Sequence, residues 1–201
     1  MLLPQSFYDR DALDVAHDVL GAVIVLEEVK LRITEVEAYR HGLDSANHCR
    51  SGRTKRNAPM WGPPGHAYIY LCYGMHWMLN LVTNAEGEGA AVLVRGCEPI
   101  EGLERIRSRR GNKNGPVLLT GPGKVGAALN LDQSFNHMAL FESGGLEVHS
   151  GKAPQQRLAG PRVGIGYADP KDIEAPWRLA IADNPWVSHP KPLRPLESRS
   201  H

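Results

Sequence analysis

The chain has 201 residues, of which 42% are hydrophobic, so it can bury a proper core and is expected to form one domain. The formal net charge is +1, and bulk charge therefore selects no class of partner. Three widely spaced cysteines, Cys49, Cys72 and Cys97, form no CxxC pair and support neither a zinc ribbon nor a disulfide framework. His48 and Cys49 could supply two metal ligands, but nothing nearby completes a tetrahedral set. We expect no metal and no cofactor.

The N-terminus has no basic start followed by a long apolar run, which a secretory signal peptide requires. The longest nearly apolar stretch, residues 68–82, is too short to cross a membrane as a helix. We therefore expect a soluble, intracellular protein that does not associate with membranes.

Hydrophobic periodicity predicts a mixture of helices and strands. Residues 40–64 form a polar loop, and a loop of that length in a compact domain is typically functional. The expected elements, in chain order, are a helix at Asp11–Leu20, strands at Ala22–Leu26 and Leu31–Tyr39, a hairpin at Tyr68–Val82, a strand at Ala90–Arg95, a helix at Glu98–Arg110, a helix that starts after Thr120-Gly-Pro-Gly-Lys124 and ends at about Leu129, and strands at Gly145–His149, Arg162–Tyr167 and Trp177–Ile181.

These elements favour the α+β class rather than alternating βαβ units. We predict a single compact domain over residues 1–188, built on a curved, largely antiparallel and partly open, barrel-like sheet. Helices would surround this sheet, and a β-hairpin would protrude from it. The Pro-rich tail, residues 189–201, is expected to be flexible.

The hairpin concentrates aromatic side chains. Four of the thirteen aromatic residues lie within ten positions: Tyr68, Tyr70, Tyr73 and Trp77. Strand alternation places Tyr68 and Tyr70 on one face, and Tyr73 falls where the chain reverses. A stacking surface beside a projecting ring suits a flat ligand such as a nucleobase. Ordinary sheet packing of tyrosines is the alternative.

Two carboxylates interrupt the strand that precedes the long loop. The period of two places Ile33, Glu35, Glu37 and Tyr39 on one face, although glutamate is disfavoured in mid-strand. One interpretation is an edge strand with a solvated face. The other is a carboxylate held inside the fold, where it can act as a general base on a water molecule.

Basic residues gather in the long loop. Four of the seven residues from Arg50 to Arg56 are basic, and none is acidic. A second cluster runs from Arg105 to Lys113. Such runs are usually solvated surface, but they permit a surface that faces phosphates.

Several motifs follow one another in a fixed order. They are Glu35-Val-Glu-Ala-Tyr39, Asn47-His48, the basic loop Arg50–Asn57, Tyr68-Ile-Tyr-Leu-Cys-Tyr-Gly-Met75, Asn80, Val92-Leu-Val-Arg95 with Glu98-Pro99, Gly121-Pro-Gly-Lys124, Arg162-Val-Gly-Ile-Gly166 and Pro185-Trp-Val-Ser188. Over nearly its whole length the chain thereby resembles the alkyladenine (3-methyladenine) DNA glycosylase family, the mixed α/β type distinct from helix-hairpin-helix glycosylases. Each motif is weak alone, but their order and spacing are specific.

The resemblance implies a monofunctional enzyme that flips a damaged purine out of the duplex and hydrolyses its N-glycosidic bond, without a metal or a lyase step. Glu37 matches the family's general base, which activates the attacking water, and Arg95 matches a residue that helps to hold that water. Tyr73 matches the wedge that fills the space left in the duplex. Lys124 and the loop residues Arg50, Arg53, Lys55 and Arg56 are candidates for contacts with the DNA backbone.

The resemblance also implies a base pocket. Tyr39, His48 and Tyr70 match residues that stack on the extruded base and orient it, and Asn80 matches the residue that disfavours guanine. The implied partner is double-stranded DNA containing 3-methyladenine, 7-methylguanine, hypoxanthine or etheno-adenine, bound by a monomer. The resemblance further implies a compact bacterial-type enzyme, cytoplasmic and associated with the nucleoid. Two alternatives stay open: a non-catalytic nucleic-acid-binding domain, and a metal-dependent hydrolase that uses Glu35, Glu37 and His48.

Overall fold

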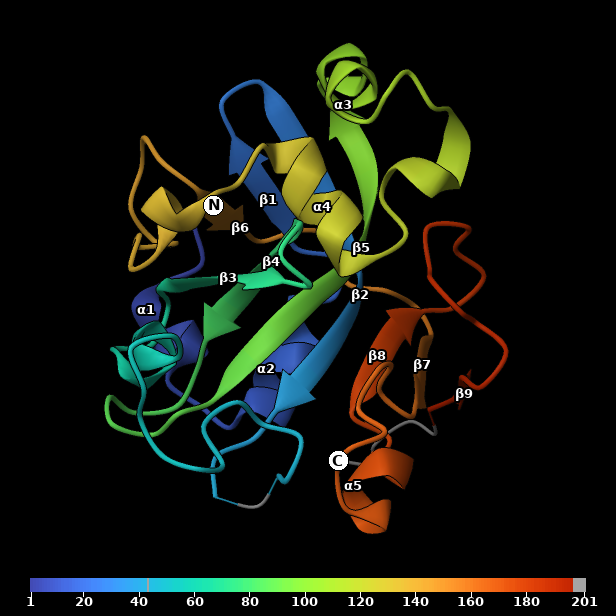
Figure 1. The fold of residues 1–201 in the computed structure, drawn as a ribbon. Coiled ribbons are helices and arrows are strands. Elements are labelled where there is room, and N and C mark those ends of the chain that lie inside the picture. The colour runs from blue at the N-terminus through green and yellow to red at the C-terminus, as the bar shows by residue number, and fades with distance from the viewer. Residues whose placement is uncertain (43, 197–201) are drawn as a thin grey trace.

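Nine strands pair in one sheet within residues 1–42 and 44–196, the part of the chain that the computed structural model describes (Figure 1). The main path is β3-β4-β5-β2-β8-β7-β9, and β1 joins β2 to β6 beside it. All these pairings are antiparallel, and the end strands β3 and β9 do not pair, so the sheet is open and not a closed barrel. The strands are β1 Val23–Leu26, β2 Val29–Tyr39, β3 Ala67–Cys72, β4 His76–Val82, β5 Ala91–Glu101, β6 Glu147–His149, β7 Arg157–Gly160, β8 Arg178–Ile181 and β9 Arg194–Pro195.

Short helices surround the sheet, which confirms the α+β class. The α-helices are α1 Gln5–Tyr8, α2 Ala12–Val19, α3 Leu103–Arg109, α4 Pro122–Leu129 and α5 Pro170–Glu174, and the 3-10 helices are η1 Ala58–Trp61, η2 Gly115–Leu118 and η3 Gln133–Phe135. In α2 the Asp11 carboxylate caps the first turn by accepting from the Leu13 N–H, and the apolar stripe of the helix is buried. Among the described residues, no helix has the length and apolarity needed to span a membrane.

The strand β2 is central, so the edge-strand interpretation of its carboxylates is wrong. Its register against β5 shifts at Lys30/Leu31 and twice more between Ile33 and Val36, where Thr34 has no partner on β5 and Arg95 has none on β2. Each strand thus has one extra, unpaired residue at this point, and the side chains beyond it point to the face opposite to the one that strict alternation predicts. Ile33 therefore packs in the core with Val36, whereas Glu35 and Glu37 point away from it. The predicted common face of Ile33 and the two glutamates is thus broken between them.

The helix predicted at Glu98–Arg110 begins later than expected. β5 continues to Glu101, and its pairing is supported by the ion pair between Lys30 and Glu101, 2.9 Å apart. Gly102 then turns the chain with φ of 78°, where an added Cβ would lie 2.7 Å from the Glu28 carbonyl oxygen. The helix therefore starts only at Leu103.

The strand predicted at Arg162–Tyr167 is absent from the described structure, where this segment consists of turns and bends. Gly164 has φ of 79°, and the Val163 N–H donates to a carboxylate instead of a neighbouring strand. On the side of β8 away from β2, the pairing strand is β7, a few residues earlier in the chain. Part of the Pro-rich tail pairs with β7 as β9, and residues 197–201 lie outside the described part of the chain. The domain boundary at residue 188 stays a prediction.

Candidate active site

The register slip in β2 and β5 builds a buried charge cluster. Arg95 lies between the two glutamates: its Nε is 3.3 Å from Glu35, and its Nη1 is 3.3 Å from Glu37. Both glutamate side chains are fully buried, and that of Arg95 is 6% exposed. Burial would lower the pKa of Arg95, but the carboxylates of Glu37 and Glu35 outweigh it and raise that pKa, so the guanidinium stays charged.

Glu35 has a structural environment. It accepts hydrogen bonds from the Ser188 N–H at 2.7 Å, the Ser188 hydroxyl at 2.9 Å and Arg178 Nη1 at 3.0 Å, besides the contact with Arg95. Arg178 is completely buried and also donates to the carbonyls of Pro161 and Ser188. Four protein donors thereby hold Glu35, three on Oε1 and one on Oε2, and this carboxylate ties the segment before the tail to the sheet.

Glu37 has a different environment, with one oxygen less occupied. Its Oε1 accepts from the Val163 N–H at 2.7 Å and faces Arg95, while its Oε2 accepts only the Tyr39 hydroxyl, at 2.9 Å. Burial and then the charge of Glu37 raise the pKa of Tyr39, so this phenol stays a proton donor to the carboxylate. Glu37 Oε2 therefore retains a lone pair that can take a proton from water.

A small cavity lies beside Tyr39. It is lined by Tyr39, His48, Met60, Tyr68, Tyr70 and Asn80, which brings all four residues predicted for the base pocket together. The cavity encloses about 10 Å³, which is room for about one water molecule. A purine would enter only after the lining side chains move apart. Tyr68 and Met60, neither of which was predicted for the base pocket, line the cavity as well.

The ring of His48 forms part of the cavity wall and is neutral. Its ring makes an edge contact with Tyr70, with centroids 4.7 Å apart, and its Nδ1 is 3.2 Å from the Tyr68 hydroxyl. Burial, followed by the positive charges of Arg56 and Arg50, lowers the pKa of His48. The imidazole is therefore neutral at neutral pH, so one of its nitrogens carries a proton and the other can accept a hydrogen bond.

Asn80 has both burial and a fixed orientation. Its Nδ2 donates to the Tyr68 carbonyl at 3.0 Å across the hairpin, and the side chain is buried. The hairpin carries Tyr73 at its tip, where the side chain is 85% exposed and φ is 50°. An exposed ring on a turn of left-handed conformation has no packing role, so the tip is free to contact a partner.

The basic residues divide into two groups. Arg50 and Arg56 are engaged locally: Arg50 lies over the Tyr167 ring, and Arg56 lies over Tyr70 and donates to the Leu71 carbonyl at 3.1 Å. Arg53 and Lys55 are exposed on the same loop. Lys124 lies at the start of α4, where burial and the charges of Arg110 and Lys113 lower its pKa.

Sequence reasoning missed a second buried pair behind the cavity. Arg162 binds Asp44 through both nitrogens, at 2.5 and 2.7 Å, and its guanidinium lies 4.7 Å from the Tyr39 ring centroid. The pair fixes Tyr39 from behind. Asp44 gave no signal because it lies in an irregular polar loop, and Arg162 was assigned to a strand.

Comparison with known proteins decides the family. The profile of the methylpurine-DNA glycosylase family matches residues 6–185. The chain belongs to this family. It is 63% identical over 196 residues to a Nitrosococcus oceani protein provisionally named 3-methyladenine DNA glycosylase, covering 98% of each chain. It is 54% identical over 198 residues to the DNA-3-methyladenine glycosylase of Arabidopsis thaliana, covering 97% of this chain and 78% of that protein.

Membership of the methylpurine-DNA glycosylase family agrees with the resemblance predicted from the motifs, and makes the chain a DNA N-glycosylase. The alternative metal set is not assembled: the two glutamates hold arginines, and His48 faces the tyrosines instead of them. In the described part of the chain, no three potential ligands among His, Cys, Asp and Glu come together.

Proposed function

We propose that this glycosylase hydrolyses the N-glycosidic bond of alkylated or deaminated purines in double-stranded DNA, using a water molecule activated by Glu37. The observation that carries this proposal is the asymmetry of the two buried carboxylates. Glu35 is held by four donors from two arginines and Ser188, none of which lines the aromatic cavity, whereas Glu37 accepts hydrogen bonds from the Val163 N–H and, on Oε2, from the hydroxyl of Tyr39, which lines that cavity.

The reaction follows from this geometry. Glu37 Oε2 takes a proton from water, the water oxygen bonds to C1′ of the flipped nucleotide, and the C1′–N9 bond breaks with its electron pair passing to the base. Arg95 anchors the opposite carboxylate oxygen, so Oε2 keeps its direction during the proton transfer. A base alkylated at N3 or N7 already carries positive charge and leaves readily.

Base selection follows from the cavity. Tyr39, Tyr70 and the neutral His48 offer electron-rich aromatic surfaces, and stacking of a base on such a ring contributes about 1–3 kcal/mol. A cationic base adds a cation–π attraction of up to about 2 kcal/mol when water is excluded. Asn80 would meet the exocyclic amino group of guanine and disfavour it. 3-Methyladenine, 7-methylguanine, hypoxanthine and etheno-adenine are the proposed substrates.

Flipping a base out of the duplex leaves a gap in the base stack, which a protein side chain can fill. Flipping costs a few kcal/mol in unstacking and unpairing. Tyr73, exposed at the hairpin tip, would enter the space left in the duplex and offset part of this cost. We propose that the protein does this as a monomer and performs no lyase step.

Single-turnover base release tests the proposal. Duplexes carrying one hypoxanthine or one 7-methylguanine are incubated with wild type in EDTA, and the free base is quantified. Release would establish the glycosylase. Binding of damaged duplex without release of any base, across a panel that includes 3-methyladenine and etheno-adenine, would favour the non-catalytic binding domain.

A further inference from the structure

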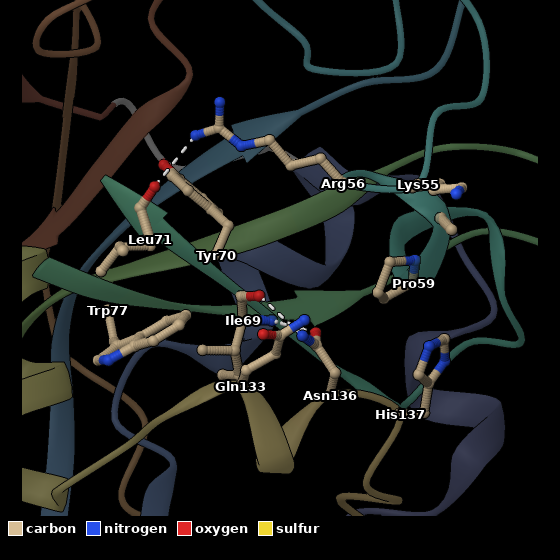
Figure 2. A pocket seen from close by; sticks show the side chains of 11 residues that line it. Lys55, Arg56, Pro59, Ile69, Tyr70, Leu71, Trp77, Gln133, Asn136 and His137 are labelled. Atoms are coloured by element: carbon tan, nitrogen blue, oxygen red, sulfur yellow. Dashed lines mark hydrogen bonds between the residues drawn. The ribbon is translucent and has the colours of Figure 1, made fainter. Parts of the chain in front are cut away.

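A groove much larger than the base cavity runs along the free edge of β3 (Figure 2). Its volume is about 720 Å³, within the range of pockets that enclose an organic ligand, about 300–1,000 Å³. Residues 55–59, which lead into η1, form one wall and residues 133–137, which include η3, form the other, with Ile69 and Leu71 of β3 between them. We call this feature the edge groove. It shares Tyr70 with the base cavity.

The edge groove is closed to a peptide strand. The Asn136 side chain accepts from the Ile69 N–H at 2.7 Å and donates to the Ile69 carbonyl at 3.0 Å, in the manner of a neighbouring strand. Arg56 Nη2 donates to the Leu71 carbonyl at 3.1 Å (Figure 2). These side chains occupy the edge groups that an added strand would need. The occupant must therefore be recognised by side chains and not by backbone pairing.

The charge of the edge groove is positive. Lys55 and Arg56 line it, and no carboxylate does. Lys55 is exposed and, among the described residues, has no hydrogen bond or ion pair to a protein group. Asp132 precedes the groove residue Gln133, but its carboxylate accepts hydrogen bonds from the Ser134 N–H and hydroxyl at the start of η3. A ligand with negative charge fits these walls.

The remaining surface suits a nucleotide. Leu71, 36% exposed, provides apolar area, Trp77 adds a half-buried aromatic ring, and the exposed amide of Gln133 is a polar group in the lining. Cations that follow a phosphate backbone, combined with aromatic surface for bases, are the features of sites that hold a single nucleic-acid strand.

We propose that the edge groove binds the lesion-bearing DNA strand within one to three nucleotides of the flipped base. This inference rests on the proposed function. Arg56 connects the two sites, because its guanidinium lies 5.7 Å from the Tyr70 ring centroid and the same side chain lines the edge groove. A nucleotide stacked at Tyr70 is covalently tied to its neighbours, so the next phosphates of that strand reach Arg56 and Lys55 first.

The test is a set of duplexes with a central hypoxanthine in which one phosphate at a time is replaced by a neutral methylphosphonate, on either strand. Binding is measured in the Glu37→Gln background, which retains the groove and prevents base release. Replacement at one or two positions beside the lesion, on the lesion strand, should weaken binding severalfold. The same replacement should cost nothing further in Lys55→Ala, because the two changes remove one contact.

Two further variants sharpen the result. Lys55→Ala should reduce the slope of log affinity against log salt by about 0.9, which is the loss of one phosphate contact. Lys152→Ala is the matched control, since Lys152 is exposed near β6, outside the edge groove. Gln133→Glu places a negative charge in the groove and should weaken binding by about tenfold without changing stability, because Gln133 is exposed.

If Lys55→Ala cancelled the effect of neutral phosphates on the complementary strand instead, the assignment of the groove to the lesion strand would be overturned. If Lys55→Ala and Lys152→Ala had the same affinity for every duplex, whichever phosphate was neutralised, DNA binding in the edge groove would be overturned altogether. Neither result affects the proposed function, which is read separately as base release by protein with Glu37 intact. Failure of that release would overturn the proposed function while the binding measurements still decide the groove.

Discussion

Replacement of Glu37 by glutamine separates chemistry from structure in this enzyme. The Val163 N–H and Arg95 both contact Oε1, and only the Tyr39 hydroxyl contacts Oε2. A glutamine with its amide oxygen at the Oε1 position keeps the first two contacts, and its NH₂ group can donate to the Tyr39 oxygen. All three contacts survive, but the lone pair that accepts the proton of water is gone.

The expected magnitudes follow from these contacts. Loss of a general base lowers the rate of base release by about 10²–10⁴-fold. The free energy of unfolding should fall by only about 1–2 kcal/mol, because charged hydrogen bonds become neutral ones and Arg95 keeps its contact with Glu35. Single-turnover release from hypoxanthine-containing duplex in EDTA measures the first quantity, and urea unfolding measures the second.

Glu35→Gln is the matched control, since it removes the same charge, on the same strand and beside the same arginine. Glu35 Oε2 accepts a hydrogen bond from the Ser188 N–H, and Oε1 accepts from three further donors. The NH₂ group of a glutamine at this position would therefore face a protein donor whichever oxygen it replaced. This variant should lose about 3–5 kcal/mol of stability, yet still release base below its midpoint of unfolding. Base release by Glu37→Gln at the wild-type rate, or complete inactivity of folded Glu35→Gln alone, would refute the division of roles between the two carboxylates.

Three further predictions concern the aromatic site. Tyr73→Ala should weaken lesion binding by about 5–150-fold, equivalent to one stacking contact, and leave thermal stability unchanged because the ring is 85% exposed; a shift in midpoint would mean that the ring packs in the fold. Asn80→Ser should raise release of guanine relative to hypoxanthine, and an unchanged ratio would remove Asn80 from selectivity. Burial and the charges of Arg56 and Arg50 hold the pKa of His48 below 6.5, so below that pH the unfolded state binds its proton first. Urea unfolding near neutrality and at about pH 5 should therefore show a larger loss of stability for wild type than for His48→Gln, and equal losses would contradict a depressed pKa.

Short-range patterns of apolar and aromatic residues predicted the helices and strands that those patterns define. The apolar stripe of α2, the extent of β2 and the aromatic hairpin were predicted correctly to within a few residues, although the alternation within β2 was not. The helix expected from Glu98 failed because Ile100 and Leu103 seemed to share a buried stripe with Ile106. Only Ile106 is buried, while Ile100 is 50% and Leu103 45% exposed. Spacing alone does not reveal which apolar residues face water.

The site shows the same limit at longer range. The base pocket was predicted because its motifs lie close together in the chain and resemble those of a known family. The supports behind it, Arg162 with Asp44 and Arg178 with Glu35, join residues more than a hundred positions apart. No periodicity connects such partners, and a buried arginine on a short strand is improbable from composition alone.

The register slip between β2 and β5 explains why the carboxylates became a site at all. Without it, strict alternation from Ile33 would direct Glu35 and Glu37 into the hydrophobic core, where charge is prohibitively costly. The paired irregularity at Thr34 and Arg95 turns both glutamates away from the core and brings the arginine from β5 to the same face. Gly96 permits it, since a Cβ there would lie 2.7 Å from the Trp186 carbonyl, which the Thr34 hydroxyl also binds. One glycine and one threonine therefore set the position of the proposed general base, although neither touches it.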